Sequence, residues 1–258
     1  MSKFLYVGCG NHRLKGFTHV EIDFAKTYSK GTTVKPPEIL CDITKKIPLK
    51  DNSVELIYSS ETMEHLKYRE FLNHLIEAYR ILKIGSIVRI CVPDLYQIVL
   101  RFTERKVDIE NEKKNRPYDP DFPISNYSEL FVNEIMYDDH FYNHNFETLS
   151  NCLTKVGFEE IKRCYPGDFE NDNQIITSSI KEAEKNRHEL LIVTAKKIRP
   201  YSNISKLDLA NKRNIFIQIL EKYLNLTIYP ANHRKTYFPQ KNFFKEKLYI
   251  IRKIFFND

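Results

Sequence analysis

Short apolar runs recur along the first ninety residues and predict the strands of a sheet. The strand candidates, most of which are such apolar runs, are Phe4–Val7, His19–Ile22, Glu38–Cys41, Val54–Ser59 and Ile87–Val92. Runs this short and this apolar are typical of strands that are buried on both faces of a parallel sheet. Two later runs, near Glu160–Tyr165 and His188–Ala195, predict the last strands of the same domain.

Between these runs the apolar residues follow a helical period. Tyr68–Leu82 has an apolar stripe on one side, and Gly85 follows at an expected helix end. A second helix is expected over Tyr96–Ile109, and a third over NFETLSNCLTKVGF, where Gly157 closes it. Strands that alternate with helices predict a doubly wound α/β sheet with right-handed crossovers.

Two segments depart from this alternation. Residues 96–137 contain the polar run NEKKNRPYDPDF and a segment rich in Tyr and Phe, and such an insertion is usually a lid or a substrate-binding element. Charge separates the other segment: residues 1–198 hold 28 Lys+Arg against 30 Asp+Glu, whereas residues 199–258 hold 12 against 4. We therefore predict one domain at 1–198 and a basic helical extension at 199–258.

The extension predicts two amphipathic helices, NKRNIFIQILEKYLNL and KNFFKEKLYIIRKIFF. Cations surround the apolar stripe of the second, as in helices that lie on an anionic membrane surface. Docking on the chain's own domain, or on a second subunit of a homodimer, is the alternative. No apolar run reaches the roughly 20 residues of a membrane span, and no cleavable leader is expected. Five cysteines at irregular spacings favour reduced thiols, so the expected location is the cytoplasm, with the inner face of the membrane as the alternative.

Candidate chemistry begins in FLYVGCGNHRLKGFTHVEID, where a glycine turn joins two predicted strands. Gly8 and Gly10 let the backbone turn sharply and approach a ligand closely. Glu21, at the end of the second strand, can accept hydrogen bonds from both hydroxyls of a ribose. The connection is shorter than a parallel crossover normally needs, so NHRLKG is expected to form only a loop or a single turn.

Two more loops follow strands that are predicted to end at the same edge of the sheet, where ligands bind in such folds. In LCDIT, Asp42 can accept a hydrogen bond from an exocyclic amine while Ile43 packs on a base; SSETMEHL closes the pocket. The predicted cofactor-binding residues are therefore Gly8, Cys9, Gly10, Asn11, Glu21, Asp42, Ile43, Ser59, Ser60 and Glu61.

In this order the motifs resemble the class I S-adenosylmethionine-dependent methyltransferases, in the compact type-11-like branch associated with bacterial surface polysaccharides. VGCGN looks like the first motif, VEID the second, CDIT the adenine loop, and EAYRILKIGSIVRICVPD the passage usually written RxLKPGG. The resemblance covers about Lys3–Lys197, although His12 replaces the usual third glycine. It implies S-adenosylmethionine as cofactor and a Rossmann-like seven-stranded sheet, mostly parallel, with an antiparallel last strand.

The resemblance also implies a catalytic base. HFYNHNFETL lies over the family pattern HKxxYxxETL, which places the family histidine at His140. A hydroxyl needs a base near the transferred methyl group, and histidine changes charge near neutral pH. His140 is the expected base, with Asp139 or Asp94 to orient or replace it. His140 and His144 could instead ligate a metal, but no third ligand is evident and no metal is expected.

The acceptor is expected from the resemblance to be a sugar hydroxyl, or a sugar's substituent, in capsule or lipopolysaccharide biosynthesis. SSET stands where base-modifying enzymes carry an NPPY-type tetrapeptide, so no nucleic-acid partner is expected. A non-sugar small molecule remains an alternative, as does a vestigial fold that binds RNA or a membrane. Residues expected near the acceptor, or alternatively in an ordinary pocket wall or core, are His65, Tyr118, Tyr127, Tyr137, Tyr142 and His144.

Overall fold

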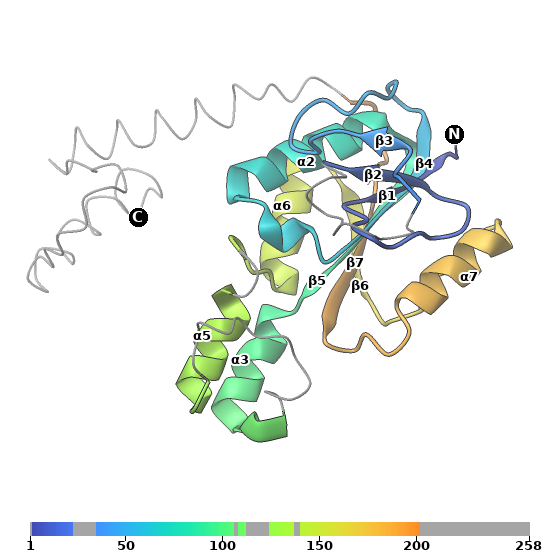
Figure 1. Ribbon diagram of the computed structural model, residues 1–258. Coiled ribbons are helices and arrows are strands. Elements are labelled where there is room, and N and C mark those ends of the chain that lie inside the picture. The colour runs from blue at the N-terminus through green and yellow to red at the C-terminus, as the bar shows by residue number, and fades with distance from the viewer. Residues whose placement is uncertain (1, 23–34, 106–107, 112–123, 137–139, 202–258) are drawn as a thin grey trace, which may run out of the picture. The chain divides into compact units, whose positions relative to one another are not determined.

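The computed structural model describes most of the predicted domain (Figure 1), over residues 2–22, 35–105, 108–111, 124–136 and 140–201. The predicted extension lies outside these residues beyond Tyr201, as do three of the predicted site residues, Tyr118, Tyr137 and Asp139. Within the described ranges, no helix has both the length and the apolar character needed to cross a membrane. The domain boundary near Ile198 and the nature of the insertion stay predictions.

A seven-stranded sheet forms the centre, in the order β3-β2-β1-β4-β5-β7-β6. Strands β1 to β5 pair in parallel, and β7 runs antiparallel to both of its neighbours. This confirms the predicted doubly wound sheet with its antiparallel last strand. The strands are β1 (Phe4–Val7), β2 (Thr18–Glu21), β3 (Ile39–Leu40), β4 (Val54–Ser60), β5 (Leu82–Pro93), β6 (Glu159–Cys164) and β7 (Leu190–Lys196).

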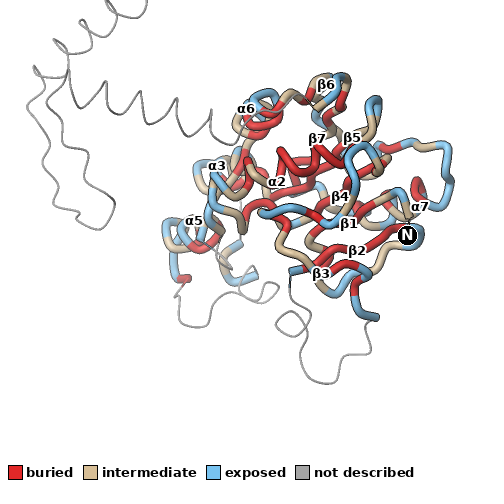
Figure 2. The backbone as a smooth tube through the Cα atoms, turned by 90° about the horizontal axis from the view of Figure 1, so that it is seen from above, coloured by how far each residue is buried: buried red, intermediate tan, exposed pale blue. Residues whose placement is uncertain are grey.

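Helices cover both faces of the sheet, and buried residues gather between the layers (Figure 2). Helices α2 and α6 lie together on one side, whereas α7 lies on the other and α3 packs with α5 beyond the end of β5 (Figure 1). The helices are α2 (Tyr68–Ile81), α3 (Leu95–Glu104), α5 (Tyr127–Met136), α6 (Phe146–Val156) and α7 (Gln174–Ala183), with a 3₁₀ turn η1 (Met63–His65).

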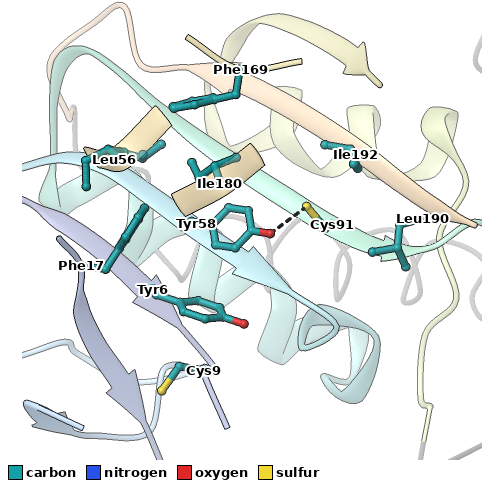
Figure 3. Packing of buried hydrophobic residues seen from close by; sticks show 11 residues of the cluster. Tyr6, Cys9, Phe17, Leu56, Tyr58, Cys91, Phe169, Ile180, Leu190 and Ile192 are labelled. Carbon is teal, nitrogen blue, oxygen red and sulfur yellow. Dashed lines mark hydrogen bonds between the residues drawn. The ribbon is translucent and has the colours of Figure 1, made fainter. Parts of the chain in front are cut away.

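The connection from β1 to β2 contains no helix, as predicted, and α7 takes over the face that a crossover helix would have covered. Ile176 and Ile180 of α7 are fully buried and pack in one cluster with Tyr6 and Tyr58 of the sheet (Figure 3). The Ser179 hydroxyl also donates a hydrogen bond of 2.8 Å to a carbonyl of the β1–β2 connection. Helix α7 was not among the elements predicted from the sequence.

A buried ion pair ties the end of α7 to the middle of the sheet. Arg89 of β5 donates from Nε and Nη2 to the two carboxylate oxygens of Glu184, at 2.6 and 2.7 Å, and both side chains are fully buried. Glu184 also accepts a hydrogen bond from the Gly167 amide. Bidentate geometry with further hydrogen bonds is what makes a buried pair tolerable, because it replaces the water that both charges lost.

Helix α2 has the predicted bounds to within one residue, but the role predicted for Gly85 and the predicted end of α3 are wrong. Gly85 does not end α2: the helix stops at Ile81, the chain turns straight into β5, and Gly85 sits within the strand at φ +86°, where its amide donates to the Lys197 carbonyl at 2.7 Å. Strand pairing therefore overrides the apparent helix end. Helix α3 stops at Glu104, short of the predicted Ile109, because the next residue takes a left-handed conformation. Gly157, at φ +100°, does end α6 as predicted.

Candidate functional site

The loops after β1 and β4 are locked together at one edge of the sheet. Gly8 has φ +66°, and a Cβ at this position would lie 2.1 Å from the Thr62 Cγ2 atom. The Thr62 hydroxyl donates a hydrogen bond of 3.0 Å to the Gly8 carbonyl oxygen. Glycine at position 8 is thus needed for the approach of Thr62. Sequence reasoning missed Thr62, although it lies within the SSETMEHL loop.

Gly10 and Glu21 form the part of this edge that suits a ribose. The Gly10 amide donates to Glu21 Oε2 at 2.9 Å, and Glu21 Oε1 accepts from the Ile22 amide at 2.7 Å. These bonds fix the carboxylate, while each oxygen keeps a further lone pair for a ligand hydroxyl. Around Gly10, a Cβ would meet no other described atom within 4 Å. Among the described residues the turn therefore leaves space beside a fixed acceptor, as a ribose-bearing cofactor would need.

The loop after β3 presents Asp42 as a carboxylate. Its Oδ1 accepts from the amide and the hydroxyl of Thr44, at 2.9 and 2.6 Å, and Lys45 lies 3.1 Å from Oδ2. The hydrogen bonds from Thr44 hold the pKa of Asp42 below its usual range. Ile43 is only 7% exposed, so most of its side chain packs in the core. Asp42 Oδ2, held only by an exposed lysine, is the oxygen available to an amine.

In the loop after β4, two of the predicted cofactor-binding residues, Ser59 and Glu61, are buried or paired with another side chain. The Ser59 side chain is fully buried. Glu61 is held in a left-handed conformation, at φ +51°, and its carboxylate forms an ion pair with Arg187 at 2.7 Å. Of the remaining predicted cofactor residues in this loop and the first, Ser60 is half-buried, Cys9 is buried and Asn11 is exposed. The segment before β7, which carries Arg187, therefore also borders this edge.

Three titratable side chains meet just beyond Thr62. One nitrogen or oxygen atom from each of Glu64, His65 and His140 lies within 4.8 Å of the other two. The rings of His65 and His140 are 5.0 Å apart in an edge-on arrangement. Glu64 is 1% exposed, and burial raises its pKa to about 8. The sequence singled out both histidines but neither their proximity nor Glu64.

The backbone of this turn fixes the segment that carries His140. The Glu64 carbonyl oxygen accepts from the amides of Phe141 and Tyr142, at 2.9 and 3.2 Å. The Tyr142 ring lies 5.3 Å from that of Tyr68 at the start of α2. Two residues distant in sequence, His65 and His140, are thus held on the same side of the sheet edge.

Asp94 and His144 have packing roles in the structure. Asp94 is buried: its Oδ1 accepts from the Tyr96 amide at the start of α3, and its Oδ2 pairs with Arg163 at 2.6 Å. His144 is fully enclosed, with its ring 4.8 Å from that of Phe71, and burial lowers its pKa to about 4. His144 is absent from the grouping around Glu64, so the His140–His144 pair considered for a metal is not the pair that meets.

The aromatic residues expected near the acceptor separate in the structure. Tyr142 lies beside the His140 segment. Tyr127 begins α5, where its hydroxyl donates to the Arg105 carbonyl at 3.0 Å and its ring faces the Arg105 guanidinium. Tyr127 thus has a contact that explains its position within the α3–α5 pair, without a ligand.

Comparisons with known proteins give a match to one family model and several similar solved structures. Residues 5–90 match a family model described as a methyltransferase domain. No curated protein sequence matches the chain. Among solved structures, phosphoethanolamine N-methyltransferase 2 of Haemonchus contortus, in complex with S-adenosyl-L-methionine, is 14% identical with a TM-score of 0.43; the match covers 76% of this chain and 48% of that one. The chain thus spans about half the length of that protein.

Two further structures are similar at the same level. A SAM dependent methyltransferase from Archaeoglobus fulgidus is 17% identical with a TM-score of 0.43, over 75% of this chain and 85% of that one. A possible histamine N-methyltransferase from Thermotoga maritima is 18% identical with a TM-score of 0.39, over 76% and 83%. The matched segment, residues 5–90, runs from β1 into β5 and includes all three loops of the site. Residues 5–90 thus match a methyltransferase domain, and the chain has the Rossmann-like sheet expected of a class I S-adenosylmethionine-dependent methyltransferase.

Proposed function

We propose that this protein transfers a methyl group from S-adenosylmethionine to a hydroxyl of a sugar, or of a sugar's substituent, in capsule or lipopolysaccharide biosynthesis. The observation that carries the proposal is the placement of His140 against His65, beside the loop whose Thr62 contacts Gly8. A titratable nitrogen next to the cofactor loops is what an alcohol acceptor needs. The motif resemblance supports the choice of a sugar and of the pathway.

In this proposal some residues bind the cofactor and another activates the acceptor hydroxyl. When bound, S-adenosylmethionine supplies a methyl group on a sulfonium, which needs positioning more than chemical help. Glu21 would hold the ribose, and Asp42 would accept from the adenine amine. A sugar hydroxyl remains a poor nucleophile until its proton is removed, and His140 is the side chain that we assign to its activation.

A product screen tests this function. The full chain is incubated with S-adenosylmethionine and a panel of nucleotide-activated sugars, non-sugar alcohols and amines, and products are read by mass spectrometry. The proposal predicts a gain of one methyl group, about 14 Da, on a sugar acceptor. A methylated amine or non-sugar alcohol as the preferred product would replace the sugar assignment. Cofactor binding without transfer to any member would favour a binding module instead.

We also propose that the basic extension holds the enzyme at an anionic membrane surface. The support is the sequence pattern of residues 241–253, where five cations surround an apolar stripe: Lys241, Lys245, Lys247, Arg252 and Lys253. Each cation near the lipid contributes about 1 kcal/mol. The full chain should co-sediment with vesicles that contain an anionic lipid, and replacement of these five residues by Gln should abolish this. If the parent and the variant sediment with the vesicles to the same extent, the membrane proposal is wrong and docking of the extension on a protein surface is favoured.

A further inference from the structure

The buried carboxylate of Glu64 has no counter-charge of its own among the described residues, and only the backbone amides of Thr62 and Glu64 act on it as donors. It is 1% exposed, and among the described residues its Oε2 atom has no hydrogen-bond partner. The guanidinium of Arg187, whose charge acts on Glu64, already forms ion pairs of 2.7 Å with Glu61 and 2.6 Å with Glu189. Burial of an ionised carboxylate without a counter-charge costs several kcal/mol. Such a group is therefore stabilised either by protonation or by a bound cation.

The two groups nearest to this carboxylate are good ligands for a cation. His65 and His140 each bring a ring nitrogen into the same space, with all three candidate atoms within 4.8 Å of one another. Both histidines are half-buried residues, so the group is not fully sealed from solvent. Two imidazoles and one carboxylate form the donor set of catalytic zinc sites and of other open divalent sites.

We propose that Glu64, His65 and His140 bind one divalent transition-metal cation of the zinc type. Ligand atoms around zinc lie about 3.4 Å apart in tetrahedral geometry, at metal–ligand distances of about 2.1 Å. The observed spacing therefore needs only small rotations of two half-buried histidines. The backbone supports the arrangement, because the Glu64 carbonyl holds the amides of Phe141 and Tyr142 and so keeps His140 close to the turn.

The function of the cation rests on the proposed function. Three protein ligands leave coordination positions open, and an acceptor hydroxyl bound there would become more acidic. Its proton would pass to solvent water, the oxygen would form a bond to the methyl carbon, and the carbon–sulfur bond would break to leave a neutral thioether. His140 then activates the hydroxyl as a metal ligand, and no free base at this position is needed.

Metal titration of the full chain tests the site without any need for activity. The untagged protein is stripped with a chelator, exchanged into metal-free buffer and titrated with Co²⁺, followed by Zn²⁺ competition and calorimetry. We expect a visible absorption band of Co²⁺ with four or five ligands, which reaches its maximum at one Co²⁺ per chain. Addition of Zn²⁺ should remove the band, because Zn²⁺ displaces Co²⁺ from the site. Glu64→Gln and His65→Ala should each weaken binding at least 100-fold. His188→Ala, which changes an exposed histidine outside the group, should bind as the parent does.

Several results would overturn the inference. Absence of a saturable one-equivalent site is one; unchanged affinity in folded Glu64→Gln or His65→Ala is another, because the ion would then bind elsewhere. Far-ultraviolet circular dichroism shows whether each variant is folded. If Glu64→Gln unfolds, His65→Ala provides the test, because His65 is only half-buried. The proposed function is judged separately: metal binding without any methylated acceptor would remove that function alone, whereas full transfer in the stripped enzyme would remove the catalytic function of the metal alone.

Discussion

The Thr62 hydroxyl donates a 3.0 Å hydrogen bond to the carbonyl of Gly8, a residue 54 positions earlier in the chain. The bond joins the glycine turn after β1 to the loop after β4, which are the two sides of the cofactor edge. It is possible only because residue 8 has no side chain, since a Cβ there would overlap the Thr62 side chain. The two glycines of the turn consequently have different functions: Gly8 allows the approach of Thr62, and Gly10 leaves space for the cofactor.

Alanine substitutions at the two positions should distinguish these functions. Gly8→Ala should lower the free energy of unfolding by about 2–3 kcal/mol, because it adds left-handed strain and displaces Thr62. Gly10→Ala meets no described atom within 4 Å, so it should cost only about 1 kcal/mol of strain yet weaken cofactor binding. Urea unfolding and calorimetry measure the two effects. Equal losses of stability would contradict the different surroundings of the two glycines.

Helix α7 should be part of the core even though it lies in the connection between β6 and β7. Ile180 is fully buried against the sheet, whereas Ile175 on the same helix is 47% exposed. Ile180→Ala should therefore lower the free energy of unfolding by roughly 2–5 kcal/mol, and Ile175→Ala by well under 1 kcal/mol. Chemical denaturation of both variants makes the comparison. Similar small losses would mean that α7 does not cover this face of β1 and β4.

His140 should matter for turnover and not for the cofactor. With an acceptor from the product screen, His140→Ala should lower kcat by roughly 10²–10⁴-fold, while the dissociation constant of S-adenosylmethionine stays unchanged. The exposed His188→Ala is the matched control and should keep the parent kcat. A fall of less than tenfold in a folded His140→Ala protein would assign the activation to another group.

Stability should fall in mild acid because His74 is buried in its neutral form. Its Nδ1 atom lies 3.2 Å from the Ile43 carbonyl oxygen, and burial lowers its pKa to about 4 despite nearby Glu77. The unfolded chain takes up this proton below about pH 6.5, so the stabilisation present above that pH is lost as pH falls toward 4.

A non-ionisable side chain isolates this effect. The loss of stability from pH 7.5 to pH 5 should be smaller by about 2 kcal/mol in His74→Gln than in the parent, because contributions from other groups cancel in the comparison. Urea unfolding at the two pH values gives the four free energies. His188→Gln should behave as the parent. An identical pH dependence in His74→Gln and the parent would show that His74 does not titrate as proposed.

Local patterns were sufficient to predict the sheet and the short β1–β2 connection. Phe4–Val7 is an apolar run followed by a glycine turn, and the next strand, Thr18–Glu21, begins too soon after it for a full helix to lie between them. Helix α7 also had a local signal, since Asn173 caps it and Ile176 and Ile180 lie one turn apart. That signal was missed because the surrounding segment is polar. Gly85 was misread because its strand pairing with Lys197 depends on a residue far along the chain.

The site was less predictable because its main contacts join distant residues. Motifs located Gly10 and Glu21, which lie in one loop and the strand that follows it. No local pattern indicates that His140 meets His65, since a 3₁₀ turn and a loop 75 positions later must first be brought together by the sheet. Burial of Glu64 is likewise a consequence of tertiary packing. The same packing engages both oxygens of Asp94, which looked available in the sequence.

The most direct test of the cofactor site is a calorimetric titration of the full chain with S-adenosylmethionine, alongside Glu21→Ala and Glu21→Gln. We expect one site per chain. Removal of the carboxylate should cost about 1.5–3 kcal/mol, a loss of roughly 10- to 150-fold in affinity, because charged hydrogen bonds to the ribose disappear and the Gly10 amide loses its partner. Gln, which keeps one acceptor oxygen, should lose less. Absence of binding by the folded parent, or equal affinity in the parent and Glu21→Ala, would contradict the assignment of this edge.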